Sequence, residues 1–308
     1  MAKRASLEGC FRLSTQVAKL TQFLWQIILL LRWNKPEGRL ILMLPALWAL
    51  VLAERSLEQN PPLDLLLVII GGSLATSAGG CVVNDLWDRE IDSQVERTKS
   101  RPLAAKTLTI GVGVVVLFAA TICAYGFAQY LTPLSFTLCW LAVPVIAFYP
   151  ACKRFFPVPQ LVLSLAWGFA VLIPWSAVTG GLNLTVWVLW LAVVSWTMGF
   201  DTVYALSDRP EDLKIGIKSS AIFFGDKTPQ AIAICWGITA LCLLYIGYVI
   251  PLDRFYYLAW SAAVLLWLWQ CQKLADPNAS PDLFPRVFRQ NVYIGAILLA
   301  GMESLSFL

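Results

Sequence analysis

Residues 63–92 read LDLLLVIIGGSLATSAGGCVVNDLWDREID, an apolar run that ends in a cluster of carboxylates. The run 63–83 is long enough to cross a bilayer, because about 20 helical residues at roughly 1.5 Å each cover the hydrocarbon core. Asn84, Asp88 and Asp92 follow at intervals of four, so they share one face if the helix continues. This stretch predicts a membrane helix whose end carries a polar site.

The composition of the whole chain is that of a membrane protein. Of its 308 residues, 58% are hydrophobic and 14% are charged, with a mean hydropathy of +0.69. A soluble domain of this length carries roughly a quarter charged residues to cover its surface. A bilayer removes the need for that polar surface, so the low charge content favours a chain embedded in a membrane.

The chain contains no histidine. This excludes a Ser-His-Asp triad, a histidine base, haem ligation by histidine and the usual histidine-containing zinc sites. None of the eight cysteines forms a CxxC pair, and most lie inside apolar runs, so we interpret them as packing residues. Metal chemistry would therefore use oxygen ligands, which suit Mg²⁺.

Apolar runs long enough to span recur along the chain and predict nine transmembrane helices. The predicted spans are 38–54, 63–83, 107–130, 133–149, 159–179, 183–203, 229–250, 254–272 and 287–307. Turn residues separate them, such as Asn60-Pro61-Pro62, Gly180-Gly181 and Pro277-Asn278. We expect an all-α polytopic membrane protein with nine helices around a central cavity, in which residues 38–308 form a single transmembrane domain.

Residues 1–37 precede the first predicted span. Their basic residues Lys3, Arg4, Arg12 and Lys19 stand ahead of the apolar stretch 23–31. No small-residue cleavage site follows that stretch, so we interpret it as an interfacial helix leading into the first span and not as a signal peptide.

The basic residues are distributed asymmetrically over the predicted loops. One side would hold residues 1–37 and the loops around 85–106, 150–158, 204–228 and 273–286, with 21 of the 23 Lys and Arg residues, counting the adjoining span ends. The other side keeps only Arg55 and Arg254. Because cytoplasmic loops carry an excess of Lys and Arg, the N-terminus and both long charged loops are predicted to be cytoplasmic.

A second acidic cluster follows the sixth predicted span. Residues 204–212 read YALSDRPED, in which Asp208 and Asp212 are again four residues apart. Carboxylates gathered in this way repel one another unless a cation lies between them. Two such clusters, one in each half of the chain, predict two metal-binding surfaces that face a shared cavity. Metal ions bound there would have coordination sites left for phosphate oxygens.

Basic residues follow each acidic cluster. Arg97, Lys99 and Arg101 come after the first, and Lys214 and Lys218 come after the second. Metal ions and cations that converge on one place form a diphosphate site. Each Lys or Arg taken singly is equally consistent with an ordinary cytoplasmic loop, so the prediction depends on the paired carboxylate clusters.

These residues resemble the membrane-bound UbiA-type aromatic prenyltransferases. The family carries an NDxxDxxxD segment followed by RTxxRP, and here residues 84–92 are followed by Arg97-Thr98-Lys99-Ser100-Arg101-Pro102. The second family motif, YAxxDxxDDxxxGxKS, is matched over residues 204–219, with Glu211 in place of the usual Asp. The stretches RWNKPEG at 32–38 and YPACKR at 149–154 are similar to further family landmarks. The resemblance runs from about residue 30 to the end.

Within the family the chain is most similar to 4-hydroxybenzoate polyprenyltransferases, chiefly in residues 201–205 and 216–219. The resemblance implies transfer of a long-chain polyprenyl group from its diphosphate to the ring of 4-hydroxybenzoate, ortho to the hydroxyl, in ubiquinone or plastoquinone biosynthesis. Mg²⁺ would assist departure of the diphosphate, followed by electrophilic aromatic substitution. Either a carboxylate of the acidic loops or the released diphosphate would accept the ring proton.

The expected site residues fall into two groups. The catalytic and metal-binding carboxylates are Asp88, Asp92, Asp208 and Asp212. The expected substrate-binding residues are Asn84, Asp85, Arg32, Arg97, Arg101, Lys153, Arg154, Tyr204, Lys214 and Lys218. Among these, Arg154 is the candidate for gripping the benzoate carboxylate, because its planar guanidinium suits bidentate recognition.

Two alternatives stay open. Another acceptor of the same family, such as haem, chlorophyllide or homogentisate, would use the same clusters. A secondary transporter would also be polytopic, but transporter sites lie near the bilayer midplane, whereas these acids lie at the cytoplasmic rim. The expected partners are the lipid bilayer and the two substrates, with no nucleic acid and no obligate protein partner. The expected location is a bacterial-type plasma membrane, with the site facing the cytoplasm.

Overall fold

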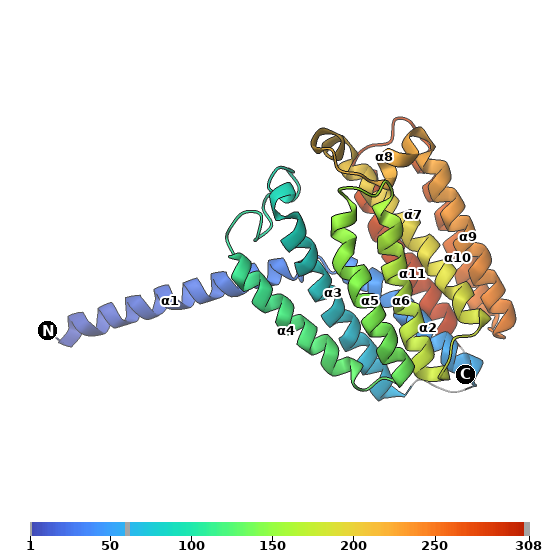
Figure 1. Ribbon diagram of the computed structural model, residues 1–308, viewed down its shortest axis with the longest axis horizontal. Coiled ribbons are helices and arrows are strands. Elements are labelled where there is room, and N and C mark those ends of the chain that lie inside the picture. Colours follow the sequence, from blue (N-terminus) through green and yellow to red (C-terminus); the bar gives the residue numbers. More distant parts are fainter. Residues whose placement is uncertain (1, 59–61, 305–308) are drawn as a thin grey trace. The chain divides into compact units, whose positions relative to one another are not determined.

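The computed structural model describes residues 2–58 and 62–304, with side chains described from residue 16 onward. Within these ranges the regular structure is helical, which confirms the all-α prediction (Figure 1). The long helices are α1 Ala2–Leu30, α2 Glu37–Ser56, α3 Leu63–Asp92, α4 Ile110–Ala128, α5 Pro133–Cys152, α6 Pro159–Thr179, α7 Leu184–Ile215, α9 Thr228–Val249, α10 Arg254–Leu274 and α11 Leu283–Glu303. Two short elements, α8 Ser220–Phe224 and η1 Gly225–Lys227, connect α7 to α9.

Each predicted span lies on one long helix, but two helices run past their predicted ends. α3 continues to Asp92 and α7 to Ile215, so the acidic segments 84–92 and 204–212 are helix ends and not loops. The interpretation as loops was wrong because the charged side chains in α3 are stabilised within the protein and do not force the helix to end. Residues 59–61, which include Asn60 and Pro61, and residues 305–307 of the last span lie outside the described residues, as do the side chains of Lys3, Arg4 and Arg12.

Six helical stretches in the described ranges are long and apolar enough to cross a membrane. They are α3, α4, α5, α6, α7 and the segment Ser220–Val249 that contains α9. α2, α10 and α11 have 20 or 21 residues each, but they are not among the six. The protein is therefore an integral membrane protein with at least these apolar helices, while the number nine stays a prediction.

Helix ends carry local signals that explain where they form. Thr132 and Asn183 cap α5 and α7 by accepting hydrogen bonds from Ser135 N and Val186 N at 3.4 and 3.1 Å. Asp253 does the same for α10, accepting from Phe255 N at 2.9 Å. Such caps satisfy amide groups that have no partner inside the helix. α6 ends at Gly180, whose φ of +71° suits glycine, so the predicted Gly180-Gly181 turn is present.

The chain divides into two compact units, which are described separately. Unit 1 comprises Met1–Pro36 and Ala78–Ala120, and unit 2 comprises Glu37–Ser77 and Thr121–Leu308. α3 and α4 each contribute residues to both units. In unit 1 the last turn of α1 packs on the following segments, with Leu30, Val82, Leu103 and Leu108 forming its buried core.

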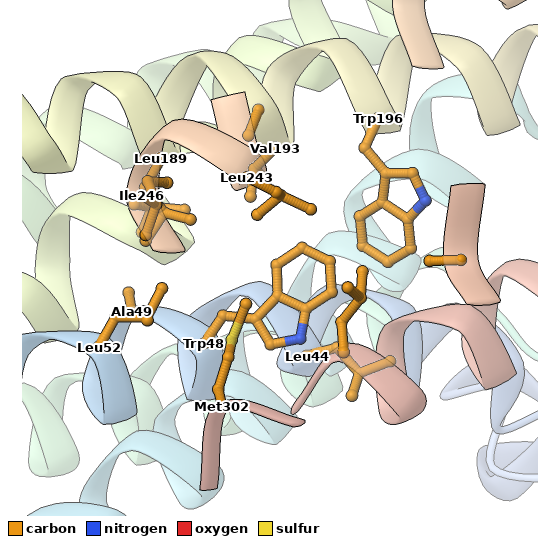
Figure 2. Close-up of a cluster of buried hydrophobic side chains, with 14 of the residues drawn as sticks. Leu44, Trp48, Ala49, Leu52, Leu189, Val193, Trp196, Leu243, Ile246 and Met302 are labelled. Carbon is orange, nitrogen blue, oxygen red and sulfur yellow. The ribbon is translucent and has the colours of Figure 1, made fainter. Parts of the chain in front are cut away.

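In unit 2 six helices contact one another in a closed order. The contacts run from α2 to α6, α7, α9, α10 and α11 and back to α2, and α5 packs outside on α6 (Figure 1). Buried apolar side chains pack between these helices. Trp48 of α2 stacks on Trp196 of α7 with ring centroids 4.9 Å apart, beside Leu189, Leu243 and Ile246 (Figure 2). Dispersion contacts of this density hold membrane helices together where lipid removes the hydrophobic driving force.

A buried amide also connects three helices of unit 2. Asn291 of α11 accepts hydrogen bonds from the indole N–H groups of Trp196 in α7 and Trp267 in α10, at 2.9 and 3.1 Å. Its own amide group donates to the Val287 carbonyl at 2.9 Å. Because buried polar groups are costly when unpaired, these bonds define how α7, α10 and α11 are arranged.

Candidate active site

In unit 1 the last turns of α3 carry three buried carboxylates. Asp85, Asp88 and Asp92 are only 2%, 3% and 6% exposed. Their spacing of three and four residues places them on one face of the helix, which Asn84 borders. The sequence-based grouping of Asn84, Asp88 and Asp92 therefore holds, and Asp85 belongs with it.

Two arginines compensate these carboxylates. Arg101 Nη1 lies 2.7 Å from Asp92 Oδ2 and 3.3 Å from Asp85 Oδ1, so one guanidinium serves two acids. Arg32 Nη2 lies 2.6 Å from Asp85 Oδ1. Arg32 follows α1 with a φ of +54°, a conformation that is uncommon for residues with a side chain. Both arginines were predicted from sequence as substrate-binding residues, and within unit 1 they contact the carboxylates.

The segment after α3 is folded back onto the helix end. The Thr98 hydroxyl, which is buried, donates a hydrogen bond to the Asp92 carbonyl at 3.0 Å. Leu103 and Leu108 anchor the same segment in the core of unit 1. Arg97 and Lys99 are exposed, and Lys99 pairs with Glu96 at 2.6 Å. This arrangement holds Arg101 over the carboxylates while the neighbouring cations face outward.

The same turns of α3 also border a small cavity. Leu86, Trp87, Arg89 and Glu90 line a small open cavity of about 260 Å³ there. Arg89 forms an exposed ion pair with the adjacent Glu90 at 3.1 Å. Asp85, Asp88 and Asp92 are not among the residues that line this cavity.

In unit 2 the end of α7 carries the second acidic cluster. Asp208 and Asp212 are half-buried and lie one helical turn apart. α7 ends at Gly216, with a φ of +74°, and its N–H donates to the Asp212 carbonyl. The exposed Lys214 and Lys218 lie on either side of this turn. At Gly216 the chain therefore changes direction immediately after the second acidic cluster and continues toward Lys218.

The end of α5 lies beside this turn within unit 2. The Lys218 N–H donates to the Lys153 carbonyl at 2.9 Å, which joins the second motif to the segment 149–154. The Lys153 ammonium lies 5.4 Å from the centre of the Tyr149 ring, a cation–π distance. Arg154 is exposed, and its Nη1 donates to the Pro150 carbonyl at 3.3 Å. The structure therefore joins the backbones of Lys153 and Lys218, while their role in one substrate site stays a prediction.

Three buried residues that sequence reasoning missed hold the second motif in place. Gln160 Oε1 accepts a hydrogen bond from the Ser220 N–H at 2.7 Å. The Ser220 and Thr202 hydroxyls are 2.8 Å apart, and Thr202 also donates to the Met198 carbonyl at 2.6 Å. Thr202 lies in the segment 201–205 that carries the family resemblance, but none of the three residues has a spacing that predicts these hydrogen bonds.

Asp201 is a further residue of α7 that was not among the predicted site residues. It precedes Asp208 by seven residues, which places it on the same face of the helix about 10 Å away. The Lys153 ammonium attracts the Asp201 carboxylate, and the Asp208 carboxylate repels it. The spacing of seven residues between Asp201 and Asp208 is visible in the sequence and could have identified Asp201. Tyr204 lies between Asp201 and Asp208 and packs on Phe288, with ring centroids 5.0 Å apart.

The donor set suits a hard divalent cation. Both clusters offer carboxylate oxygens, and in unit 1 two carboxylates already converge on a single cation, the Arg101 guanidinium. Within the part of the chain that the structure describes, no three His, Cys, Asp or Glu side chains form a ready-made metal site. Asp88 and Asp92 belong to unit 1, whereas Asp208 and Asp212 belong to unit 2, so a site using all four would need both units.

Comparison with known proteins gives a consistent result. The family model described as the UbiA prenyltransferase family matches residues 42–292. A 4-hydroxybenzoate solanesyltransferase from a Synechocystis species is 58% identical over 91% of this chain and 95% of its own. A 4-hydroxybenzoate octaprenyltransferase from Sodalis glossinidius is 40% identical over 92% of this chain and 96% of its own.

Solved structures show the same fold. A UbiA homolog from Aeropyrum pernix, solved in its apo form, has a TM-score of 0.75 at 21% identity and covers 87% of this chain and 98% of its own. A UbiA homolog from Archaeoglobus fulgidus, bound to GPP and Mg²⁺, has a TM-score of 0.68 at 17% identity and covers 92% and 100%. The same homolog has been solved with Cd²⁺ bound, so divalent metal ions do bind to proteins of this fold.

Proposed function

Because the chain belongs to the UbiA prenyltransferase family, we propose that it transfers a long-chain polyprenyl group from polyprenyl diphosphate to 4-hydroxybenzoate. The group is attached to the ring carbon ortho to the hydroxyl, as a step of ubiquinone or plastoquinone biosynthesis. The observation that carries this proposal is the 58% identity to a 4-hydroxybenzoate solanesyltransferase over nearly the full length of both chains. The buried carboxylates of α3 and the acidic end of α7 supply the chemistry it requires.

The reaction is an electrophilic aromatic substitution. The allylic C–O bond of the donor breaks, and the diphosphate leaves with the electron pair. The electron-rich ring carbon beside the phenolic hydroxyl then forms the new C–C bond. Cations near the leaving group stabilise the developing charge without a protein nucleophile. In this chain Arg97, Lys214 and Lys218 are exposed basic residues next to the acidic clusters and are the groups that would serve this role.

Asp88, Asp92, Asp208 and Asp212 would hold Mg²⁺, with Asn84 and Asp85 beside them. When bound, Mg²⁺ would act as a Lewis acid that neutralises charge on the diphosphate oxygens. Arg32 and Arg101 form ion pairs with Asp85 and Asp92 and so orient these carboxylates within unit 1. In this proposal the two arginines organise the first acidic cluster, in addition to any direct contact with the prenyl diphosphate.

The acceptor would be recognised at the end of α5. Arg154 is the proposed group for the benzoate carboxylate, with Lys153 and Tyr204 as neighbouring contacts on unit 2. After the new C–C bond forms, the ring loses one proton to an acidic-cluster carboxylate or to the released diphosphate. Loss of this proton to either group restores the aromaticity of the ring.

The arrangement in the membrane is also part of the proposal. Nine helices, namely α2 to α7 and α9 to α11, would span the bilayer around a central cavity, with residues 1–37 as an interfacial segment. The N-terminus and both acidic clusters would face the cytoplasm of a bacterial-type plasma membrane. The 21-to-2 distribution of basic residues over the two sets of loops supports this orientation. No obligate protein partner is proposed.

Product identification tests the proposed function. Membranes that contain the protein would be incubated with 4-hydroxybenzoate, with homogentisate or with a porphyrin acceptor, together with prenyl diphosphates of several lengths. We expect mass spectrometry to find a prenylated 4-hydroxybenzoate and one released diphosphate per product. Folded protein that prenylates homogentisate or a porphyrin but not 4-hydroxybenzoate would overturn the assignment of the acceptor.

A further inference from the structure

Asp201 is the first charged residue along α7. The 17 residues before it in the helix, Leu184–Phe200, contain no charge, and the flanking residues Phe200 and Thr202 are buried. An ionisable side chain in such a segment is costly, and it persists where it faces a functional space and has an identifiable partner. Asp201 itself is half-buried, so it lies at the border between the packed interior of unit 2 and an accessible space.

The packing of unit 2 does not use the Asp201 carboxylate as a hydrogen-bond acceptor. Thr202, the next residue, bonds to Ser220 and to the Met198 carbonyl, which accounts for the local polar contacts. In the described part of the chain no group donates a hydrogen bond to the Asp201 carboxylate. A charged carboxylate normally accepts several hydrogen bonds, so its oxygens are available to a donor that the protein does not supply.

Two charged groups of unit 2 act on the Asp201 carboxylate with opposite sign. The Lys153 ammonium attracts the Asp201 carboxylate, whereas the Asp208 carboxylate repels it. The backbone carbonyl of Lys153 accepts the hydrogen bond from the Lys218 N–H. Asp208 lies on the same face of α7, two turns closer to the end of the helix. Asp201 is therefore about 10 Å from Asp208 along the helix and about 16 Å from Asp212, which is too far for Asp201 and Asp212 to share a ligand.

We propose that the Asp201 carboxylate binds the phenolic hydroxyl of the aromatic acceptor by accepting its O–H hydrogen bond. This inference rests on the proposed function, since that function supplies a substrate with one such donor. A hydrogen bond to a carboxylate increases electron density on the phenol oxygen and so on the ortho carbon that attacks the allylic donor. The same bond selects acceptors, because an analogue without the hydroxyl leaves a desolvated carboxylate without a donor.

The test compares two acceptors that differ only in the hydroxyl. Binding of 4-hydroxybenzoate and of benzoate to the detergent-solubilised full chain would be measured by calorimetry in the absence of a prenyl donor. The wild type should prefer 4-hydroxybenzoate by about 10- to 100-fold, as expected for a hydrogen bond to a charged group. In Asp201→Ala this preference should fall below about 3-fold, and Asp201→Asn, which keeps a neutral oxygen, should be intermediate.

The ratio of the two affinities, for 4-hydroxybenzoate and for benzoate, separates recognition of the hydroxyl from a general disturbance of the protein structure. A merely structural role of Asp201 would weaken both ligands equally and leave the ratio unchanged. Asp276→Asn, which neutralises an exposed carboxylate in the 275–282 segment of the same unit, is the matched control and should keep the wild-type ratio. If Asp201→Ala does not fold, the nearly isosteric Asp201→Asn carries the test.

The outcomes distinguish this inference from the proposed function. A wild type that prenylates 4-hydroxybenzoate, with both Asp201 variants retaining the full preference for the hydroxyl, overturns the inference alone. A wild type that binds 4-hydroxybenzoate no better than benzoate also overturns it. A folded wild type that transfers no prenyl group to 4-hydroxybenzoate overturns the proposed function instead.

Discussion

Arg101 is the residue on which the first acidic cluster most depends. Its guanidinium contacts Asp85 and Asp92, whose side chains are only 2% and 9% exposed, while Arg101 itself is 20% exposed. Two buried carboxylates on one helix face repel each other, and removing Arg101 takes away the cation that contacts both, while Arg32 still contacts Asp85. The cluster is therefore an electrostatic unit that includes the basic residues following it.

Replacing Arg101 should destabilise the protein strongly. Arg101→Met keeps much of the side-chain volume but removes the charge, and we expect a loss of about 3 kcal/mol because a buried ion pair is broken from one side. Lys99→Met is the control, since Lys99 and Glu96 are 54% and 77% exposed and should contribute less than about 1 kcal/mol. Denaturant unfolding in detergent measures both. Equal effects of the two variants would contradict the account.

At the residue scale the sequence predicted charged groups better than neutral ones. Asp88, Asp92, Asp208 and Asp212 were predicted as site residues because they recur at spacings of four, and the structure places them near the ends of α3 and α7. Gln160 and Thr202 were not found, because a single neutral polar residue in an apolar run has no period or partner in the sequence. The contact between Arg32 and Asp85 joins residues 53 positions apart, which spacing alone does not reveal.

α7 is the element that joins the core of unit 2 to the second acidic cluster. Its buried half packs Trp196 and Phe200, and its last turns carry Asp208 and Asp212. The helix then ends at Gly216, where a φ of +74° redirects the chain toward Lys218. The position of Lys218 therefore depends on how α7 ends as well as on the bond to Lys153.

Gly216→Ala should cost about 1 kcal/mol, because a Cβ is unfavourable at positive φ. No atom lies within 4 Å of the Cβ position, so the cost is conformational and not steric. Gly181→Ala is the matched control, since Gly181 also has open space and does not have a positive φ. Thermal unfolding and the KM for the prenyl diphosphate are the measurements. A neutral Gly216→Ala with an unchanged KM would disprove this role of the turn.

Asn291 connects three helices, α7, α10 and α11, in the core of unit 2. Asn291→Leu leaves the indole N–H groups of Trp196 and Trp267 without their acceptor, and we expect a loss of about 2 to 4 kcal/mol. Asn278→Leu, in an exposed segment, should change stability by less than about 0.5 kcal/mol. Unfolding of both variants in the same detergent decides the point, and a small effect at Asn291 would show that helix packing alone positions α7, α10 and α11.

The elements themselves were largely predictable, and their ends were not. Runs of apolar residues placed each of the nine predicted ranges on a helix, because a membrane helix needs length and hydropathy more than any specific motif. The rule that charge marks a loop failed at α3, where Arg32 and Arg101 stabilise acidic residues inside the helix. Hydropathy thus finds where a helix crosses the membrane but not how far it continues beyond.

At the scale of the whole molecule, the acidic clusters are divided between two compact units. Asp88 and Asp92 belong to unit 1, and Asp208 and Asp212 belong to unit 2. The proposed reaction requires both clusters on the same side of the membrane, as the distribution of Lys and Arg predicts. The sequence indicates that shared side through charge, but no pattern in it describes the geometry between the clusters.

The sidedness can be measured with single cysteines in a variant that lacks the native ones. A cysteine at Lys106, after the first acidic cluster, and one at Tyr130, between α4 and α5, should react with a membrane-impermeant maleimide from opposite sides. In intact cells Tyr130→Cys should be labelled and Lys106→Cys protected, with the reverse in inverted vesicles. Labelling of both positions from the same side would contradict the proposed orientation.

The most direct test of the account is Mg²⁺-dependent prenylation of 4-hydroxybenzoate by the wild type, by Asp88→Ala and by Asp208→Ala, one residue from each unit. The account predicts product with Mg²⁺, none after EDTA, and a loss of at least about 100-fold in either variant, because each removes a carboxylate that holds the ion at the leaving group. Asp276→Asn should retain wild-type activity. Full turnover in EDTA, or in either folded alanine variant, would contradict the claim that the two acidic clusters act together on one diphosphate.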